Sequence, residues 1–296
     1  MEGICAIPSR QRIEILSREL APAALSAEAA LLRREIVIAL YHASGGHYGG
    51  CLSVIDILLA LYRCELHVSP DEPHDPERDR LILSKGHSAL ALYAVLHRLG
   101  FWRESLNCYA DFVSPLEGHP DMTSVPGVDF STGSLGQGLS VGVGMALGLR
   151  AGDQRVWVVL GDGECQEGQV WEAAMLAASC SLDNLHAIVD CNRLQEWGRR
   201  ARAADSAPEP VPDQAAKWRS FGWHVIECNG HDFMELLTAF DAAKATRGKP
   251  SVILANTVKG RGVPLIELQP VRFHCDSVSE AEHAAILAGM DDYEAC

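Results

Sequence analysis

Apolar segments of strand length alternate with segments of helical periodicity through the second half of the chain, and no other feature limits the possible folds so strongly. We expect strands at 155–160, 185–190, 223–228 and 251–257, with helices at 168–180, 212–221 and 232–246. Strands that are joined through helices run parallel in one sheet, and the helices then cover both of its faces. The sequence therefore predicts an α/β fold built on a mainly parallel sheet.

The first half of the chain is less regular, but it also carries helical periodicity and one short strand. We expect helices at 31–43, 52–63, 87–99 and 139–150, a strand at 80–84, and a closing helix at 278–290. Ser53 is the candidate N-cap of the second helix, after the glycine-rich residues 44–50. Residues 1–25 form a leader, and 113–138 is a long loop of the kind that is often functional. With no internal repeat and no linker, residues 1–296 are predicted to be a single domain.

The composition excludes several classes of partner and location. The formal net charge is −14, which argues against nucleic acid or an anionic membrane as the main partner. No apolar run approaches the length of a membrane span. The ten cysteines include no CxxC pair. We therefore expect reduced thiols in a cytoplasmic protein, and neither a zinc site nor a disulfide framework.

A Gly-Asp-Gly tripeptide at 161–163 follows the predicted strand 155–160 and precedes a helix. In open α/β sheets, turns in this position lie at the carboxyl edge, where ligands bind. A dinucleotide-binding fingerprint would need glycine where Gln166 stands, and a P-loop would need lysine where Gln169 stands. The tripeptide therefore indicates a different kind of ligand site, or only a β-turn.

Asn192 follows the next predicted strand, 185–190, so its side chain and that of Asp162 could converge at this edge. A carboxylate, an amide oxygen and main-chain carbonyls suit a hard divalent cation such as Mg²⁺. Such an ion completes its coordination with phosphate oxygens and water, so it would lie between Asp162 and a diphosphate. The alternative is that Asp162 only forms a turn and Asn192 only belongs to a loop.

Taken together, the tripeptide and Asn192 resemble the thiamine diphosphate motif, and five longer segments resemble the N-terminal half of transketolase. These segments are SGGHYGGCLSVIDILLALY (44–62), RDRLILSKGHSALALYA (78–94), EGHPDMTSVPGVDFSTGSLGQGLSVGVGMALG (117–148), KWRSFGWHVIECNGHD (217–232) and KPSVILANTVKGRGV (249–263). The resemblance covers roughly residues 30–265. It implies the fold of a domain that binds the diphosphate of thiamine diphosphate.

The resemblance also implies roles for individual residues. Asp162 and Asn192, with the main-chain carbonyl of Leu194, would bind Mg²⁺ or Ca²⁺. The residues implied to bind the cofactor are Gly133, Leu135, Gly136, Gly161, Asp162, Gly163, Glu167, Asn192 and Lys259. Glu167 resembles a residue that reaches the partner subunit, although a glutamate at a helix start is also favoured by the helix dipole. Lys259 could neutralise diphosphate or could simply occupy a solvated loop.

Histidines in glycine-rich loops form the catalytic part of the prediction. By resemblance, His47, His87 and His119 line the substrate channel, and His274 matches a further channel histidine in less typical surroundings. A ketose loses a hydroxyl proton before its carbon–carbon bond breaks, and an aldehyde acceptor gains one afterwards. Neutral imidazoles transfer such protons near pH 7. For any one of them alone, an ordinary structural role would be the commoner one.

No second α/β pattern follows residue 265, so we expect, by the resemblance, that this sequence corresponds to only the N-terminal half of a transketolase. By resemblance, the absent pyrimidine-binding and C-terminal domains lie on a partner chain, and the assembly contains two of each chain (α2β2). The sequence after Asn192 departs from the family at Glu196-Trp197, so the loop beside the metal is altered. The substrates are expected to be sugars or sugar phosphates, transferred as a two-carbon ketol unit.

Two other functions stay open at this stage. A 2-oxo acid dehydrogenase E1 α-like subunit would share the thiamine diphosphate motif, but the SKGH and TGSLGQG segments count against it. A non-catalytic regulatory paralogue is kept open by the altered loop at 196–203, although Asp162, Asn192 and the histidines are intact. A nicotinamide dehydrogenase is excluded by the glycine pattern.

Overall fold

A five-stranded sheet forms the centre of the computed structural model, which describes residues 21–195 and 213–294. The strands are β1 (Arg80–Leu83), β2 (Val156–Gly161), β3 (Leu185–Cys191), β4 (His224–Asn229) and β5 (Ser251–Asn256). All neighbouring pairs are parallel, in the order β1-β2-β3-β5-β4. Every strand begins and ends within one residue of its predicted range, so the predicted parallel α/β fold is confirmed.

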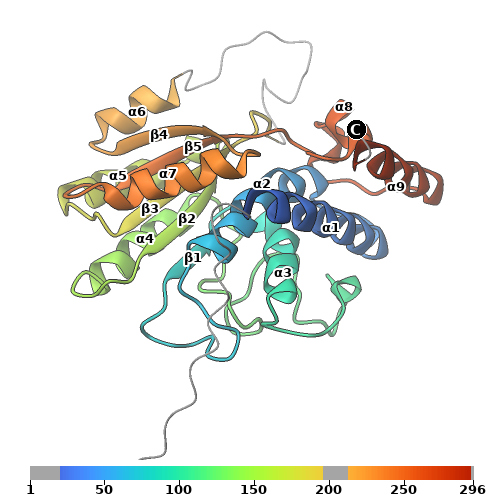
Figure 1. Ribbon diagram of the computed structural model, residues 1–296, viewed down its shortest axis with the longest axis horizontal. Helices are drawn as coiled ribbons and strands as arrows, with labels where there is room; N and C mark the ends of the chain where they lie inside the picture. Colours follow the sequence, from blue (N-terminus) through green and yellow to red (C-terminus); the bar gives the residue numbers. More distant parts are fainter. Residues whose placement is uncertain (1–20, 196–212, 295–296) are drawn as a thin grey trace, which may run out of the picture.

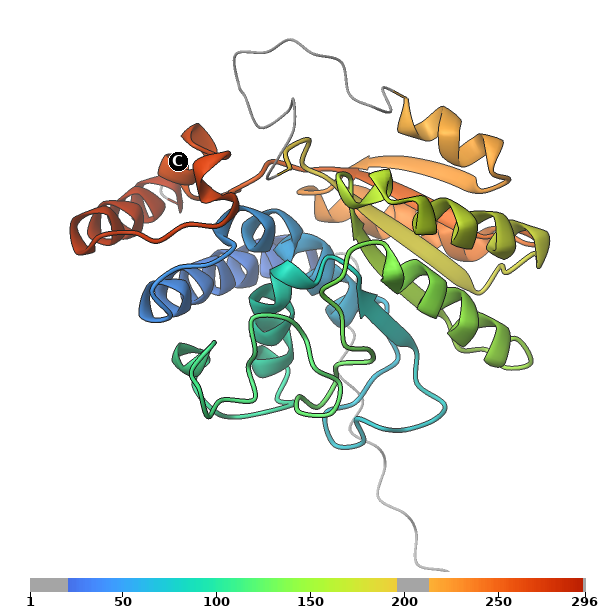
Figure 2. The ribbon, with the colours of Figure 1, turned by 180° about the vertical axis from the view of Figure 1, so that it is seen from behind.

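Helices cover both faces of the sheet (Figures 1 and 2). One buried cluster unites the sheet with α1 (Ala21–His42), α2 (Tyr48–Cys64), α3 (Ala89–Arg98) and α7 (Phe233–Ala245). The other unites it with α4 (Gln137–Gly148), α5 (Gly168–Ser179) and α6 (Gln214–Ser220). Figure 1 shows α7 on the near side of the sheet, and Figure 2, from behind, shows α4 and α5 on the opposite side.

Alternate side chains of each strand enter opposite layers. In β2, Trp157 and Val159 belong to the first cluster, whereas Val156, Val158 and Leu160 belong to the second. This alternation follows from the two-residue period of a strand. It explains why β2 reads as a continuous apolar run, since a sheet covered on both faces exposes neither set.

The remaining described elements are helices and 3₁₀ turns. They are α8 (Pro264–Leu268), α9 (Glu280–Glu294) and the 3₁₀ turns η1 (Gly86–Ser88), η2 (Leu106–Cys108), η3 (Glu164–Gln166) and η5 (Arg272–His274). The helix α9 packs beside α1, far from the sheet (Figure 1). The segment 113–136 has neither helix nor strand, as expected of the long loop.

Two predicted boundaries are wrong near the N-terminus. The first helix begins at Ala21, so the end of the predicted leader is helical. The second begins at Tyr48 with His47 at the N-cap, which makes Ser53 an interior residue. Gly49 and Gly50 therefore belong to the first turn of α2, where they do not break the helix. A Cβ atom on Gly49 would lie 2.7 Å from Lys259 Cγ, so close packing requires these glycines.

Three expectations from composition and loops can also be compared with the structure. No described helix is both long and apolar enough to cross a lipid bilayer. Of the eight cysteines within the described ranges, only Cys51, Cys165 and Cys228 are buried. The loop predicted at 198–214 lies almost entirely in the part of the chain that the structure does not describe.

Candidate active site

A cavity of about 410 Å³ lies at the carboxyl edge of the sheet, where β1, β2, β3 and β5 end. Its lining consists of His47, Gly50, Lys85, His87, Gly133, Leu135, Gly161, Asp162, Gly163, Glu164, Gln166, Glu167, Asn192, Leu194, Gln195, Lys259 and His274. All predicted site residues except His119 and Gly136 are in this lining. The carboxyl edge is the usual place for ligands in such sheets.

The two exceptions each contact a residue of the lining. A Cβ atom on Gly133 would be 3.1 Å from Cδ2 of His119, so the imidazole packs on that glycine. The main-chain N–H of Gly136 donates a 2.8 Å hydrogen bond to Glu164, which is itself in the lining. The structure therefore brings all the predicted site residues to one place.

Asp162 and Asn192 are adjacent because their strands are in register. Gly161 of β2 pairs with Asp190 of β3, so each site residue comes just after its strand. The N–H groups of Gly163 and Arg193 donate to Asp162 Oδ1 and Oδ2, at 2.8 Å and 2.6 Å. These two bonds fix the orientation of the carboxylate at the edge of the cavity.

The side chain of Asn192 is oriented by hydrogen bonds on both of its polar atoms. Its Nδ2 donates to Ser53 Oγ at 3.3 Å, and its Oδ1 accepts from the N–H of Leu194 at 3.2 Å. Asp162, Asn192 and the Leu194 carbonyl therefore offer only oxygen atoms, which suits Mg²⁺ or Ca²⁺.

The described residues contain no group of three His, Cys, Asp or Glu side chains placed to hold a metal. A cation bound to the single carboxylate of Asp162 would need further oxygen ligands from a bound anion. This is the arrangement that Mg²⁺ prefers when it binds substrate phosphates.

Three imidazole rings form a cluster on the other side of the cavity. The ring centroid of His47 is 5.2 Å from that of His87, and His274 is 5.6 Å from each of them. His274 reaches this place because Gly46 and Asp276 form an antiparallel bridge between distant segments. The bridge explains why a histidine outside the typical sequence context still enters the predicted channel.

The clustered imidazoles are kept neutral. Burial, followed by the charges of neighbouring groups such as Lys259 and Lys85, lowers the pKa of His47 to about 4 and that of His274 to about 3. The pKa of His87 is also lowered well below its usual value, mainly by burial and by Lys85. Near pH 7 each ring therefore has one nitrogen that can accept a proton or hydrogen bond.

Two buried lysines supply positive charge to the same cavity. Lys259 is only 3% exposed, so the solvated-loop alternative for this residue is wrong. Its Nζ donates to the Leu194 carbonyl at 3.1 Å and lies 2.6 Å from His274 Nδ1. Lys85 Nζ lies 2.5 Å from Asp190 Oδ2 in a fully buried ion pair. Sequence reasoning gave Lys85 no role, although a lysine directly after a buried strand was a visible signal.

Glu164 is a second residue that sequence reasoning missed. Its Oε1 accepts from Ser84 Oγ and from the N–H of Gly136, and its Oε2 accepts from the N–H of Gly161 at 3.0 Å. Burial raises the pKa of this carboxyl group, although the three donors oppose the shift. Glu164 therefore joins the turns after β1 and β2 to the loop before α4. Its place next to the tripeptide was the only sequence signal.

The loops around the cavity also cross without room for side chains. A Cβ atom on Gly86 would lie 2.8 Å from the main-chain N of Gly133, a distance that real Cβ atoms do not tolerate. The segment after β1 and the loop before α4 therefore touch backbone to backbone. Glu167 is exposed at the start of α5, and Glu196-Trp197 lies outside the described residues.

The cavity lining combines oxygen atoms that suit a cation, the buried Lys259 ammonium, and neutral imidazoles. Comparison with known proteins agrees with this chemistry. Residues 26–291 match the family model described as "Transketolase, thiamine diphosphate binding domain". A 6-deoxy-6-sulfo-D-fructose transketolase subunit from Clostridium sp. is 44% identical over 225 residues, which are 75% of this chain and 80% of that protein. A subunit of the apulose-4-phosphate transketolase from Phocaeicola vulgatus is 41% identical over 238 residues, covering 79% and 83%.

Solved transketolase structures share the fold. The transketolase of Campylobacter jejuni superposes with a TM-score of 0.78 at 29% identity, over 92% of this chain and 45% of that one. The transketolase of Leishmania mexicana gives a TM-score of 0.73 at 27% identity, with 92% and 45% coverage. The chain thus spans less than half the length of these solved structures, whereas it spans most of the length of the Clostridium and Phocaeicola subunits.

Proposed function

Because the chain belongs to the transketolase family through its thiamine diphosphate-binding domain, we propose that it is one chain of a two-chain transketolase. In this proposal it holds the diphosphate end of the cofactor, and the assembled enzyme transfers a two-carbon ketol unit from a ketose to an aldehyde. The observation that carries the proposal is the convergence of Asp162, Asn192, His47, His87 and His274 on one cavity.

The diphosphate end fits the residues around the tripeptide. Asp162, Asn192 and the Leu194 carbonyl would hold Mg²⁺, and the ion would accept diphosphate oxygens as its remaining ligands. Lys259 adds a positive charge to the same lining. When bound, thiamine diphosphate supplies the carbanion chemistry of the reaction, while the protein supplies binding, orientation and proton transfer.

The imidazole cluster would handle protons on the substrate hydroxyl and carbonyl groups. His47, His87 and His274 are neutral near pH 7, so an unprotonated ring nitrogen is available to accept a hydrogen bond from a substrate hydroxyl group and to orient it. His119, which packs on Gly133, would act from the next position along the channel. The cluster is partly buried, which limits the access of water to the reacting groups.

A partner chain would carry the pyrimidine-binding domain, with two copies of each chain in the assembly. The partner chain would cover apolar side chains on α4 and α5. Leu147, Met175 and Leu176 of these helices are 40%, 54% and 49% exposed. Exposed apolar groups of this kind mark protein interfaces. Glu167 lies at the start of α5, where a partner chain could reach it.

The substrates and location are proposed more broadly. Both of the similar subunits are named for sugars that carry an anionic group, a sulfonate or a phosphate. A sugar or sugar phosphate is therefore the donor to test first. A cytoplasmic location agrees with the buried thiols of Cys51, Cys165 and Cys228, which form no disulfide.

Purification with a candidate partner tests this function. The full chain is expressed with a polypeptide that carries a pyrimidine-binding domain, and the mass of the complex is measured by light scattering with thiamine diphosphate and Mg²⁺ present. We expect two copies of each chain and bound cofactor. A complex that forms without binding the cofactor would favour a regulatory paralogue instead. Turnover of 2-oxo acids in place of ketoses would favour an E1 α-like subunit.

A further inference from the structure

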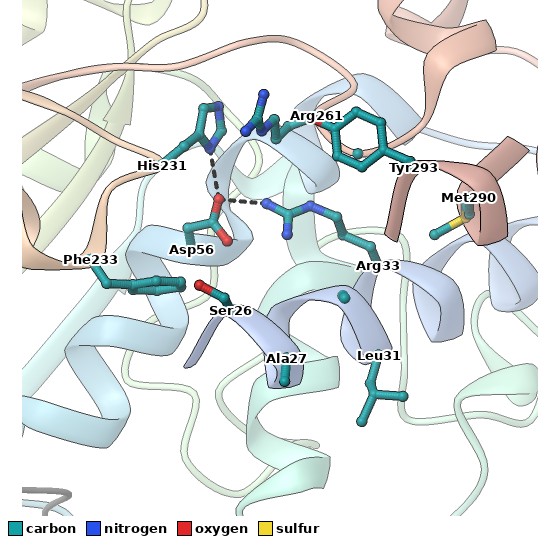
Figure 3. A pocket seen from close by; sticks show the side chains of 12 residues that line it. Ser26, Ala27, Leu31, Arg33, Asp56, His231, Phe233, Arg261, Met290 and Tyr293 are labelled. Atoms are coloured by element: carbon teal, nitrogen blue, oxygen red, sulfur yellow. Dashed lines mark hydrogen bonds and ion pairs between the residues drawn. The ribbon is translucent and has the colours of Figure 1, made fainter. Parts of the chain in front are cut away.

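A chain of hydrogen bonds runs from α1 to the backbone next to Lys259. Arg33 Nη2 of α1 lies 2.5 Å from Asp56 Oδ2 of α2, and that oxygen lies 2.6 Å from His231 Nδ1. The N–H of Val258 then donates to His231 Nε2 at 2.8 Å. Figure 3 shows Arg33 and His231 both directed at the Asp56 carboxylate, on the wall of a cavity of about 590 Å³.

The protons in this chain can be assigned from its donors. Val258 N–H occupies the lone pair of His231 Nε2, so the ring proton is on Nδ1 and points to Asp56. His231 therefore accepts a hydrogen bond from the backbone and donates one to a carboxylate. The other tautomer, with the proton on Nε2, would place that N–H against the N–H of Val258, so the direction of both hydrogen bonds is fixed.

The charged end of the chain is buried and balanced. Burial alone would raise the pKa of Asp56, but the Arg33 guanidinium and the bond from His231 hold it below its usual value. Asp56 is therefore a carboxylate near pH 7, and its Oδ2 interacts with both Arg33 and His231. A buried carboxylate held in this way has little freedom to move.

The far end of the chain controls the segment that carries Lys259. Val258 N–H is bound by His231 on one side of the lysine, and Gly260 N–H donates to the Gly49 carbonyl at 3.2 Å on the other. Arg33 touches the same segment again, because a Cβ atom on Gly262 would lie 2.8 Å from Arg33 Cδ. The backbone of 258–262 is thus held by a hydrogen bond to α2, by packing against Arg33 of α1 and by the hydrogen bond to His231.

We propose that Arg33, Asp56 and His231 are positioning residues for the cofactor, because they fix the backbone of 258–262 and so direct Lys259 into the diphosphate end of the candidate active site. This inference rests on the proposed function, which supplies the ligand. None of the three residues is in the lining of the cofactor cavity, so they act through the lysine.

Amide hydrogen exchange on the full chain without ligand tests the first step. Replacing His231 by alanine (His231→Ala) removes the acceptor of Val258 N–H, so exchange in 258–262 should accelerate about tenfold or more. The control is His186→Ala, because His186 is a buried histidine that packs at a tilt against Trp157, with no hydrogen-bond partner for its ring nitrogens among the described residues. That control should lower stability without local acceleration at 258–262. Equal exchange of this segment in wild type and His231→Ala would overturn the proposal.

Calorimetric titration with thiamine diphosphate in excess Mg²⁺, on the full chain assembled with its partner chain, tests the second step. The dissociation constant should rise about tenfold in His231→Ala, as is common for residues that support a ligand contact indirectly. In a Lys259→Met background the same substitution should change it less than about twofold. An equal effect in both backgrounds would overturn the route through Lys259. Asp56→Asn, which keeps an oxygen for both partners, should give a smaller rise.

The two steps separate this inference from the proposed function. If the wild-type chain and its complex bind no thiamine diphosphate, the proposed function is contradicted, and the exchange experiment still decides whether His231 holds 258–262. If wild type binds the cofactor and His231→Ala binds it equally well, the proposed function stands and the positioning role is contradicted.

Discussion

The main-chain N–H of Arg193 donates a 2.6 Å hydrogen bond to Asp162 Oδ2, which joins the turns that follow two neighbouring strands. Arg193 adopts a positive φ of 63° to make this bond, a conformation that costs a residue with a side chain about 1–2 kcal/mol. The backbone after β3 is therefore shaped around the carboxylate of Asp162. Strain of this kind is concentrated at functional sites.

Replacing Asp162 by alanine tests the metal site. We expect Asp162→Ala to remove the only carboxylate of the proposed oxygen set and to weaken Mg²⁺-dependent binding of thiamine diphosphate by more than about 30-fold, or about 2 kcal/mol. Calorimetry with and without Mg²⁺ measures the change. Asp153→Ala, at an exposed position in the loop before β2, is the control and should bind normally. Unchanged binding by Asp162→Ala would refute the metal assignment.

The buried ion pair between Lys85, in the cavity lining, and Asp190 should contribute strongly to the free energy of unfolding. Replacing Lys85 by methionine leaves the Asp190 carboxylate buried without its cation, which typically costs about 3–5 kcal/mol. Urea unfolding should show this loss, and adding Asp190→Asn should recover part of it. A loss below about 1 kcal/mol would mean that the pair is much weaker than its burial implies.

The neutral imidazoles predict a dependence of stability on pH. The folded-state pKa of His87 is lowered, so below pH 6.5 the unfolded chain binds more protons than the folded chain. The free energy of unfolding should therefore decrease as the pH is lowered below about 6.5. One histidine contributes a slope of up to about 1.4 kcal/mol per pH unit. Urea unfolding of His87→Gln across pH 7 to 5 should give a flatter slope than wild type. An unchanged slope would contradict a neutral, buried His87.

Glu164 should behave as a structural link between loops. Glu164→Gln places an amide N–H₂ against one of three donors, so a buried hydrogen bond is lost at a cost of about 1–3 kcal/mol. Thermal and urea unfolding measure this cost. Glu172→Gln, on the exposed face of α5, should leave stability within about 0.5 kcal/mol of wild type. Equal stability of the two variants would remove Glu164 from this role.

The sheet was predictable because its signal is local. A strand buried on both faces must be a short apolar run, as in 156–160, and each such run ends at a polar or glycine turn. The start of α2 was not predictable in the same way. Gly49 and Gly50 suggest a break when they are read alone, and only the packed Lys259 side chain shows why glycine is needed inside the helix.

The site was predictable where its residues lie in compact motifs. Asp162, Asn192 and the first three histidines could be named from their segments, and the structure gathers them around one cavity or in contact with its lining. Their roles stay predictions until they are measured. Lys85 and Glu164 were overlooked because their importance depends on burial and on partners far along the chain.

The network behind Lys259 was invisible for the same reason. Arg33, Asp56 and His231 come from three separated segments, and each is unremarkable in its own sequence context. Only the packing of α1 and α2 against the loop after β4 brings them together. Long-range polar contacts of this kind leave no periodic signature in a sequence.

Ketol transfer by the reconstituted enzyme tests the central claim most directly. This chain and a pyrimidine-domain polypeptide are assayed separately and together, with a ketose phosphate donor, an aldehyde acceptor, thiamine diphosphate and Mg²⁺. We predict transfer only when both chains and both cofactors are present. Transfer by this chain alone, or none from a complex that binds the cofactor across a panel of sugar and sugar phosphate donors, would contradict the account.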